Sequence, residues 1–282
     1  MKLPFGVSKT LGVWRQVSRV ATRPAGIIVA GNPQLVTAAR ERFAAGGFAP
    51  AEWRLPADKV AQPQIPADDL LLALVTREEE GPVMAALATC KPRGGAIVAV
   101  DEGALATGQV KFVGLRCRRL SFADTEAGWQ RLYRVCIQAA GERAVALARR
   151  YPVLREPAAS YVITRAALQS AALGVASLLR GAHAPAMAAL QLGTVLRLAA
   201  LYGQELDQER VPELAAVFAG GLGVSRLSRL VERRVVRMAW LARVGVAVLA
   251  TLAIGFAALH YYQKGAPWST SRLISFANSL RR

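Results

Sequence analysis

Short apolar runs punctuate the first third of the chain and predict the strands of a sheet. The runs at 26–30, 70–76 and 96–100 are continuous, as is typical of parallel strands that are buried on both faces. A further strand is expected near 111–114. The Pro-rich stretch 56–66 is expected to be a connecting loop.

Helical patterns fall between these strands. One helix is expected at 34–45, because Pro33 favours a helix start and Gly46-Gly47 favours its end. A second is expected at 78–89, whose three leading glutamates suit the positive end of a helix. Strand–helix alternation builds doubly wound sheets. Residues 25–122 are therefore predicted to form a small Rossmann-like α/β domain.

Beyond residue 122 the pattern is helical throughout, so 123–282 is predicted to be an Ala-rich all-α domain. The pair 158–179 and 186–202 fits either a membrane hairpin or a soluble antiparallel pair, because isolated polar residues interrupt both segments. The expected helices lie at 127–150, 158–179, 186–202, 212–220 and 225–238.

The longest apolar run, 244–262, contains no charged side chain. As a helix it would extend about 30 Å, the thickness of the hydrocarbon layer of a bilayer. Aromatic residues flank it, as they flank membrane spans, and two glycines within it permit close approach of another helix. The predicted membrane and interface residues are Trp240, Arg243, Gly245, Gly255, Tyr261 and Tyr262.

Basic charge gathers at the two ends of the chain. Residues 1–40 and 225–282 together carry 15 of the net +17, and 41–224 is nearly neutral. Basic ends beside apolar runs indicate an anionic membrane surface rather than nucleic acid. Within residues 225–282, six basic residues precede the apolar run 244–262 and four follow it. This bias predicts that the bulk of the protein is cytoplasmic.

The N-terminal segment 1–24 is predicted to hold a basic amphipathic helix at 7–20. Two placements remain open for it. Such a helix can lie on an anionic bilayer, or it can pack on the protein's own helical domain. The segment lacks the uninterrupted apolar core of a signal peptide.

Composition narrows the chemistry. Hydrophobic residues make up 53% of the chain and aromatic residues only 7%, which favours packed helices over an aromatic-rich β-sandwich. Three dispersed cysteines without a CxxC pair and only two histidines argue against a disulfide framework and a metal centre. The basic run Arg116, Arg118 and Arg119 lacks interleaved aromatics and is expected to be a solvated surface.

The turn after the first strand, Gly31-Asn32-Pro33-Gln34, has neither the glycines nor the Lys-Ser/Thr pair of a P-loop. Because a helix starts there, Gly31, Asn32 and Gln34 are kept as candidates for binding an anion. Asp101 is expected to be a loop carboxylate. His183 has no neighbouring nucleophile or carboxylate in sequence for a triad. We predict neither a cofactor nor a metal, and no enzymatic activity.

Residues 155–265 resemble the helical domain of YcjF-type bacterial inner-membrane proteins, a domain of unknown function also attached to some small GTPases. Three stretches carry the resemblance: Pro185-Ala-Met-Ala-Ala-Leu-Gln191, Leu198-Ala-Ala-Leu-Tyr-Gly-Gln-Glu-Leu206 and Thr251-Leu-Ala-Ile-Gly255. The resemblance implies a helical, membrane-associated module and no catalytic residue. It also implies that the preceding α/β domain is a degenerate GTPase-like domain. The family-motif positions are Pro185, Gln191, Tyr202, Gly203, Glu205, Thr251 and Gly255.

These observations predict a non-enzymatic scaffold or regulatory protein at the cytoplasmic face of a bacterial inner membrane. Its expected partners are anionic lipid, a second copy of the chain or a protein such as a GTPase, and not nucleic acid. One alternative is a nucleotide- or anion-responsive sensor that uses Gly31–Gln34. The other is a small channel or transporter subunit, with Arg165, Gln169 and Arg197 lining a polar path.

Overall fold

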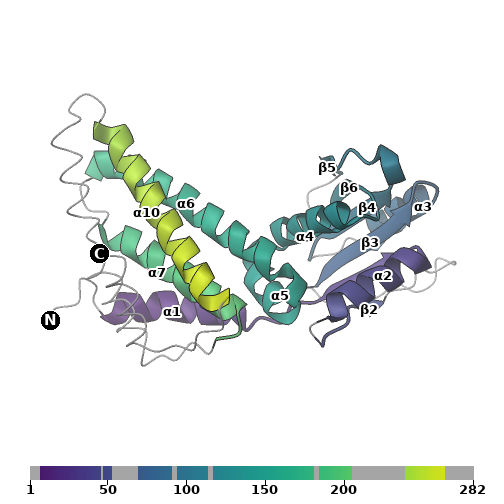
Figure 1. The fold of residues 1–282 in the computed structure, drawn as a ribbon, viewed down its shortest axis with the longest axis horizontal. Helices are drawn as coiled ribbons and strands as arrows, with labels where there is room; N and C mark the ends of the chain where they lie inside the picture. The colour runs from purple at the N-terminus through teal and green to yellow at the C-terminus, as the bar shows by residue number, and fades with distance from the viewer. Residues whose placement is uncertain are drawn as a thin grey trace. The chain divides into compact units, whose positions relative to one another are not determined.

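The computed structural model describes residues 7–45, 47–52, 69–90, 94–113, 117–180, 184–204 and 239–263. The chain divides into two compact units. One is Thr22–Ala158, and the other joins Met1–Ala21 to Ala159–Arg282. The prediction of an α/β region followed by helices is confirmed at this level (Figure 1). The helices expected at 212–220 and 225–238, and the loop at 56–66, lie outside the described residues.

The α/β unit is built on a six-stranded sheet in the order β2-β1-β3-β4-β6-β5. All neighbouring strands are parallel except β5, which pairs antiparallel with β6. The three predicted buried strands form within one residue of their expected bounds. The strands are β1 (Ile27–Gly31), β2 (Ala51–Glu52), β3 (Leu70–Thr76), β4 (Ala96–Asp101), β5 (Val110–Phe112) and β6 (Cys117–Phe122).

Helices cover the sheet because successive strand side chains point to opposite faces. Val83 and Leu87 of α3 (Glu80–Cys90) pack on one face, which includes Leu71 and Ala73 of β3. In the same unit, the ring of Phe43 on α2 (Pro33–Ala44) packs edge-on against the rings of Tyr133 and Tyr151, which follow the sheet in the sequence. The largest fully buried side chains of this unit include Phe43, Phe122, Trp129, Tyr133 and Tyr151.

The expectation of one helix at 127–150 is wrong. The chain forms α4 (Glu126–Ala140), a short 3₁₀ turn at Gly141–Arg143 and α5 (Ala144–Arg150). Gly141 adopts φ +59°, a backbone region that glycine enters without strain, and its N–H caps α4 on the Ile137 carbonyl.

The boundaries also differ from the predicted 25–122 and 123–282, since α4 and α5 belong to the α/β unit. The reason lies in the apolar face of α4, where Trp129, Leu132 and Cys136 are each 0% exposed, while α4 packs on β3, β4 and β6. A sheet of buried strands needs this cover, and an α-helix pattern alone does not reveal which surface it covers.

The helical unit contains α1 (Val7–Ala21), most of α6 (Arg155–Arg180), α7 (Ala184–Leu201) and α10 (Ala239–Gln263). α7 packs against both α1 and α10. Val17 of α1 is buried against Leu192 and Leu196 of α7. Of the two placements left open for the N-terminal helix, the structure therefore shows packing on the protein's own unit, which covers the apolar face of that helix.

Candidate membrane helix and the polar edge of the sheet

One helix in the described part of the chain, Val244–Gln263 of α10, is long and apolar enough to cross a membrane. In an apolar 18-residue stretch of this helix, only 22% is buried inside the protein, whereas a core helix of a soluble protein is mostly buried. The predicted apolar run 244–262 is thus part of a single helix, and about half of the residues in that run are neither fully buried nor fully exposed.

The buried and exposed residues of α10 form two opposite stripes. Thr251, Ile254, Gly255, Ala258 and Tyr262 are buried. Leu249, Ala253, Phe256 and His260 recur at the spacing of one helix face and are exposed; Leu249 is 67% exposed and Phe256 57%. Both stripes are apolar over most of their length, so sequence periodicity does not distinguish them.

The buried stripe of α10 makes close helix contacts within the chain. A Cβ added at Gly255 would lie 2.9 Å from Ile163 Cγ1, and one at Gly174 would lie 3.2 Å from Val244 Cγ2. Small residues thus let α6 and α10 approach closely at two points, as in membrane helix pairs. Gly245, the other glycine predicted to admit a helix, faces open space.

Among the described residues of the helical unit, the buried serine and threonine side chains are Ser170, Thr194 and Thr251. Ser170 Oγ donates to the Ala167 carbonyl at 2.7 Å, Thr194 Oγ1 donates to that of Leu190 at 2.8 Å, and Thr251 Oγ1 to that of Ala247 at 2.9 Å. Each hydroxyl is therefore satisfied by its own helix. The hydroxyl of Thr251, a family-motif position, is thus bonded within α10 itself.

Two further family-motif positions have structural roles at the end of α7. Gly203 takes φ +75°, and the N–H groups of Gly203 and Gln204 bond the carbonyls of Ala200 and Ala199. This is the Schellman pattern that ends a helix at glycine. The ring of Tyr202 stacks on that of Tyr262 with centroids 6.4 Å apart, and Tyr261 meets Tyr262 edge-on at 5.4 Å.

Other predicted residues are less informative. Gln191 is buried on α7. Of the two charged residues of the alternative polar path, Arg165 is exposed and contacts the Tyr161 hydroxyl at 3.2 Å, and Arg197 is half-buried. The positions whose side chains or backbone lie outside the described residues are His183, Pro185, Glu205, Trp240 and Arg243.

The strand order reverses between β1 and β3, and ligands of open α/β sheets bind outside the carboxyl ends of strands at such a point. Gly31 ends β1 there at φ +114°. Glycine is required at this position, because a Cβ would overlap the Leu74 carbonyl. Asn32 caps α2 by accepting the Gln34 N–H at 3.1 Å. Its amide Nδ2 lies 3.4 Å from a Glu79 carboxylate oxygen.

This geometry bears directly on the anion-site candidates Gly31, Asn32 and Gln34. The Gln34 N–H, which an anion would need, is used by the Asn32 side chain. The carboxylate of Glu79 also bonds the Thr76 N–H and hydroxyl at 2.9 and 3.0 Å. A carboxylate held beside the helix start repels a phosphate. The arrangement thus favours a self-capped turn over an anion cradle.

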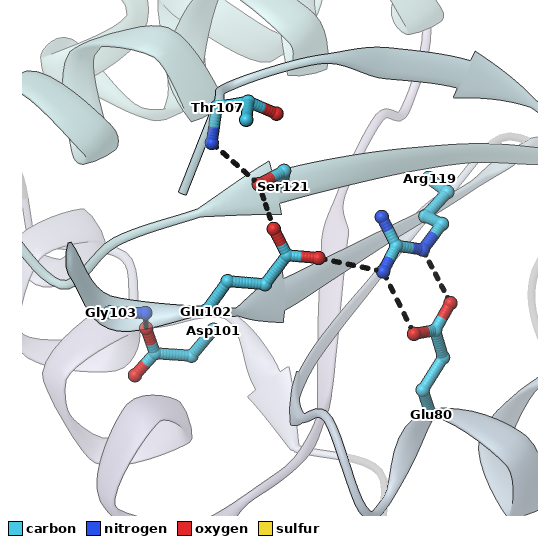
Figure 2. A network of polar contacts seen from close by, with 7 residues as sticks. All are labelled: Glu80, Asp101, Glu102, Gly103, Thr107, Arg119 and Ser121. Carbon is cyan, nitrogen blue, oxygen red and sulfur yellow. Dashed lines mark hydrogen bonds and ion pairs between the residues drawn. The ribbon is translucent and has the colours of Figure 1, made fainter. Parts of the chain in front are cut away.

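A second polar network lies nearby on the same unit (Figure 2). Arg119 of β6 forms a two-pronged ion pair with Glu80 at the start of α3, and its Nη2 also donates to Glu102 Oε1 at 2.9 Å. Ser121 donates to the other Glu102 oxygen and accepts the Thr107 N–H at 3.0 Å. Asp101, which precedes Glu102, accepts the Gly103 N–H at 2.9 Å. It is the last residue of β4 and not the loop residue that was expected.

The network shifts the ionisation of its acids. The hydrogen bond from Arg119 holds the pKa of Glu80 below its ordinary value, and the bond from Ser121, followed by that from Arg119, lowers the pKa of Glu102. Both carboxylates are thereby kept charged and engaged. Within the described residues no three His, Cys, Asp or Glu side chains gather as a metal site would require.

Sequence reasoning missed the role of Arg119, which was expected on a solvated surface together with Arg116 and Arg118. Its side chain is 20% exposed. The available signal was the alternation of polar and apolar residues over 119–122, together with the acidic residues Glu80 and Glu102 at the ends of neighbouring elements.

No family model, no curated protein and no solved structure matches this chain. The resemblance to the YcjF-type family stays a prediction.

Proposed function

We propose that this protein is a non-enzymatic, membrane-anchored scaffold or regulatory protein whose α/β unit works at the cytoplasmic face of a bacterial inner membrane. The observation that carries the proposal is the exposed stripe of α10. Leu249 and Phe256 are among the most exposed large apolar side chains of the described residues, on the one described helix that is both long and apolar enough to span a bilayer.

Exposure of these side chains to water is unfavourable, and lipid removes that cost. Burying a leucine or phenylalanine side chain gains about 1.5 to 3 kcal/mol, so a lipid environment on this stripe stabilises the inserted helix. The buried stripe, by contrast, is already used by α6 and α7. An inserted α10 therefore presents one face to lipid and one to its own chain.

Charge supports the orientation and the lipid partner. The excess of basic residues ahead of the span favours a cytoplasmic bulk by the positive-inside rule, and the basic ends attract anionic headgroups. Arg15 and Arg19 lie on the exposed side of α1, opposite Val17. These residues place cations on the surface of the same unit that holds α10.

The α/β unit supports a scaffold rather than a hydrolase. Its parallel strands follow the order 2-1-3-4-5 of flavodoxin-like doubly wound sheets, with β5 added antiparallel. This order is consistent with descent from a Rossmann-like or GTPase-like ancestor. The polar groups described at the carboxyl ends of β1, β3 and β4 bind one another, so they support structure rather than phosphate chemistry.

Cell fractionation tests the proposal. Membranes from cells expressing the full chain, or a chain ending at Val236, are washed with high salt and then with alkaline carbonate. We expect the full chain to resist both washes and the shortened chain to be soluble. Release of the full chain by salt alone would show that only the basic ends bind lipid and would overturn the anchor.

A second measurement separates scaffold from sensor. The purified full chain in detergent micelles is heated with and without nucleoside triphosphates, diphosphates or inorganic phosphate. We expect no shift in the melting temperature. A reproducible rise that is lost in Asn32→Ala would support the nucleotide- or anion-responsive alternative at Gly31–Gln34 and contradict the scaffold proposal.

A further inference from the structure

The outer edge of the sheet at β5 has unused hydrogen-bonding groups. The Val113 N–H bonds the Cys117 carbonyl, and the Gln109 carbonyl accepts the Ser121 N–H. The backbone N–H and C=O groups of the odd-numbered residues in this segment therefore point toward β6. Because backbone groups alternate along a strand, the N–H and C=O groups of Val110 and Phe112 point away from β6. β5 ends the strand order, and within the described residues no strand pairs with its outer side.

The side chains along this edge are apolar and open to solvent. Phe112 is 74% exposed, Val113 47% and Val110 38%. Leu105, in the turn that precedes the strand, is 77% exposed. An exposed apolar edge strand is a template for pairing with another chain. Large apolar side chains beside open backbone groups supply both contacts that strand addition uses.

The charge of this edge has one sign. Residues 103–123 contain four basic residues and no acidic one. Arg119 is neutralised by Glu80 and Glu102, but among the described residues no ion pair joins Lys111 or Arg118 to a carboxylate. The guanidinium of Arg118 lies over the Phe112 ring, 5.2 Å from its centroid, and donates to the Gln138 carbonyl at 3.3 Å.

We propose that β5 is a docking site for an extended acidic segment of a partner protein, which adds to the sheet as a further strand. The outward groups of Val110 and Phe112 bond its backbone. Its apolar side chains pack beside those two residues, and its carboxylates, on the opposite face of the sheet, meet Lys111. This inference deepens the proposed scaffold role, and it rests on that role only for its biological meaning.

A second copy of the chain suits this edge less well. The antiparallel register that uses all outward groups of both strands pairs Val110 with Phe112 of the other copy and sets Lys111 opposite Lys111. That central pair is of the non-hydrogen-bonded kind, in which the side chains are closest, and like charges directly opposite are destabilising. In an acidic strand, a carboxylate opposite Lys111 replaces this repulsion with an attraction.

The test uses the full chain in detergent micelles and a nine-residue peptide in which glutamate alternates with valine. Peptide binding is measured by fluorescence anisotropy, and backbone protection over 109–113 by hydrogen exchange. We expect saturable binding that protects this segment and weakens with salt. The same peptide with lysine in place of glutamate is expected not to bind.

Three variants locate the contact. Phe112→Pro removes an outward N–H while leaving the bonds to β6, and is expected to weaken binding about tenfold. Phe112→Leu keeps that N–H and is expected to bind nearly as well as the unchanged protein. Lys111→Glu is expected to weaken the acidic peptide about fivefold and to allow the lysine peptide to bind.

Failure of the acidic peptide to bind or to protect 109–113 overturns the proposal, as does binding that all three variants leave unchanged. Sedimentation provides a further outcome: a dimer that Phe112→Pro dissociates would identify a second copy as the occupant and would also overturn it. Carbonate extraction of the same variants reports the anchor separately, so this inference can fail while the membrane proposal stands.

Discussion

β3 is a strongly apolar strand and α10 a strongly apolar helix, and the chain buries them to different extents. Leu70 to Val75 of β3 are each at most 1% exposed, because β1 and β4 pair with the strand on both sides and helices cover the sheet. α10 also contains a long apolar run, yet its Leu249 and Phe256 side chains are more than half exposed.

The difference shows that apolar composition alone does not decide what an element is buried against. The α/β unit supplies its own cover from α2, α3 and α4. The described part of the helical unit covers one stripe of α10 and leaves the other open, so we infer that lipid supplies the missing cover. The comparison predicts that substitutions in the α/β unit change its unfolding, whereas substitutions on the exposed stripe of α10 change its extraction from membranes.

The largest effect is expected where the cover is internal. Trp129→Ala removes a ring that is 0% exposed, meets Phe122 at 5.1 Å and donates to Asp124 at 2.7 Å. Such a truncation costs about 3 to 5 kcal/mol of unfolding free energy. Trp129→Phe, which keeps an aromatic ring but loses the hydrogen bond, is the matched control and should cost less.

Cys136 provides a readout for this unit. Burial raises the pKa of its thiol to about 12, so it reacts with thiol reagents only when the α/β unit opens. Labelling in a urea series, localised by mass spectrometry, gives the midpoint for each variant. If Trp129→Ala leaves the midpoint unchanged, the sheet is not held by its own helices and the comparison fails.

The next effect is expected where the cover is external. Phe256→Arg places a charge near the middle of the apolar run, which costs about 2.5 to 3.5 kcal/mol for an inserted helix, and should reduce the carbonate-resistant fraction strongly. Leu105→Arg is the control, because Leu105 is 77% exposed on the α/β unit and surface changes cost at most about 0.5 kcal/mol.

If α10 were exposed to water instead, Phe256→Arg would be as harmless as Leu105→Arg and would increase the soluble fraction. Equal extraction of the two variants would therefore contradict the lipid-facing stripe. Cys136 labelling of both variants should match that of the unchanged protein, since neither substitution touches the core of the α/β unit.

The sequence pattern predicted the buried strands β1, β3 and β4 better than the break between α4 and α5 or the charged strand β6. Leu70–Thr76 was predicted at its observed bounds, because a buried parallel strand is apolar at every position. The break at Gly141 was missed, since glycine inside a helical pattern is often tolerated. β6 was missed because Arg118 and Arg119 interrupt its apolar pattern, and the carboxylates that neutralise Arg119, those of Glu80 and Glu102, lie 39 and 17 positions away.

The candidate site was predictable in part. Length and composition were enough to locate the helix 244–262, but its two faces differ only in what packs on them, and that depends on tertiary structure. Likewise, the turn at Gly31–Gln34 was predicted as a helix start, whereas the contact between Asn32 and Glu79 joins residues 47 positions apart. Local patterns carry no information on such contacts.

A smaller effect tests the buried stripe of α10. Gly255→Val adds a side chain where even a Cβ would lie 2.9 Å from Ile163 Cγ1, and the branched Ile163 cannot easily move aside. Overpacking of this kind costs about 1 to 3 kcal/mol. Gly245→Val is the control on the same helix, because Gly245 faces open space.

Thermal denaturation in micelles, followed by helical circular dichroism, should show a lower melting temperature for Gly255→Val than for Gly245→Val. The reverse order would mean that α6 and α10 do not pack at Gly255. Cys136 labelling is expected to be unchanged in both variants, which would confine the effect to the helical unit.

The smallest effect concerns the polar network at Arg119. The lowered pKa values of Glu80 and Glu102 mean that the unfolded chain takes up protons first as the pH falls. The stabilisation by their charged forms is therefore present above the ordinary pKa of about 4.5 and is lost as the pH falls through the lowered values. Cys136 labelling in urea, with a disulfide reagent that reacts in acid, should show this loss.

Arg119→Met removes the cause of much of this shift and is expected to lower the stability at pH 7 by about 1 kcal/mol while flattening the dependence on pH. Arg40→Gln is the control, since it breaks the exposed pair with Glu52 and should change stability by at most about 0.5 kcal/mol. A pH dependence that survives Arg119→Met undiminished would show that other carboxylates govern the acid stability of the sheet.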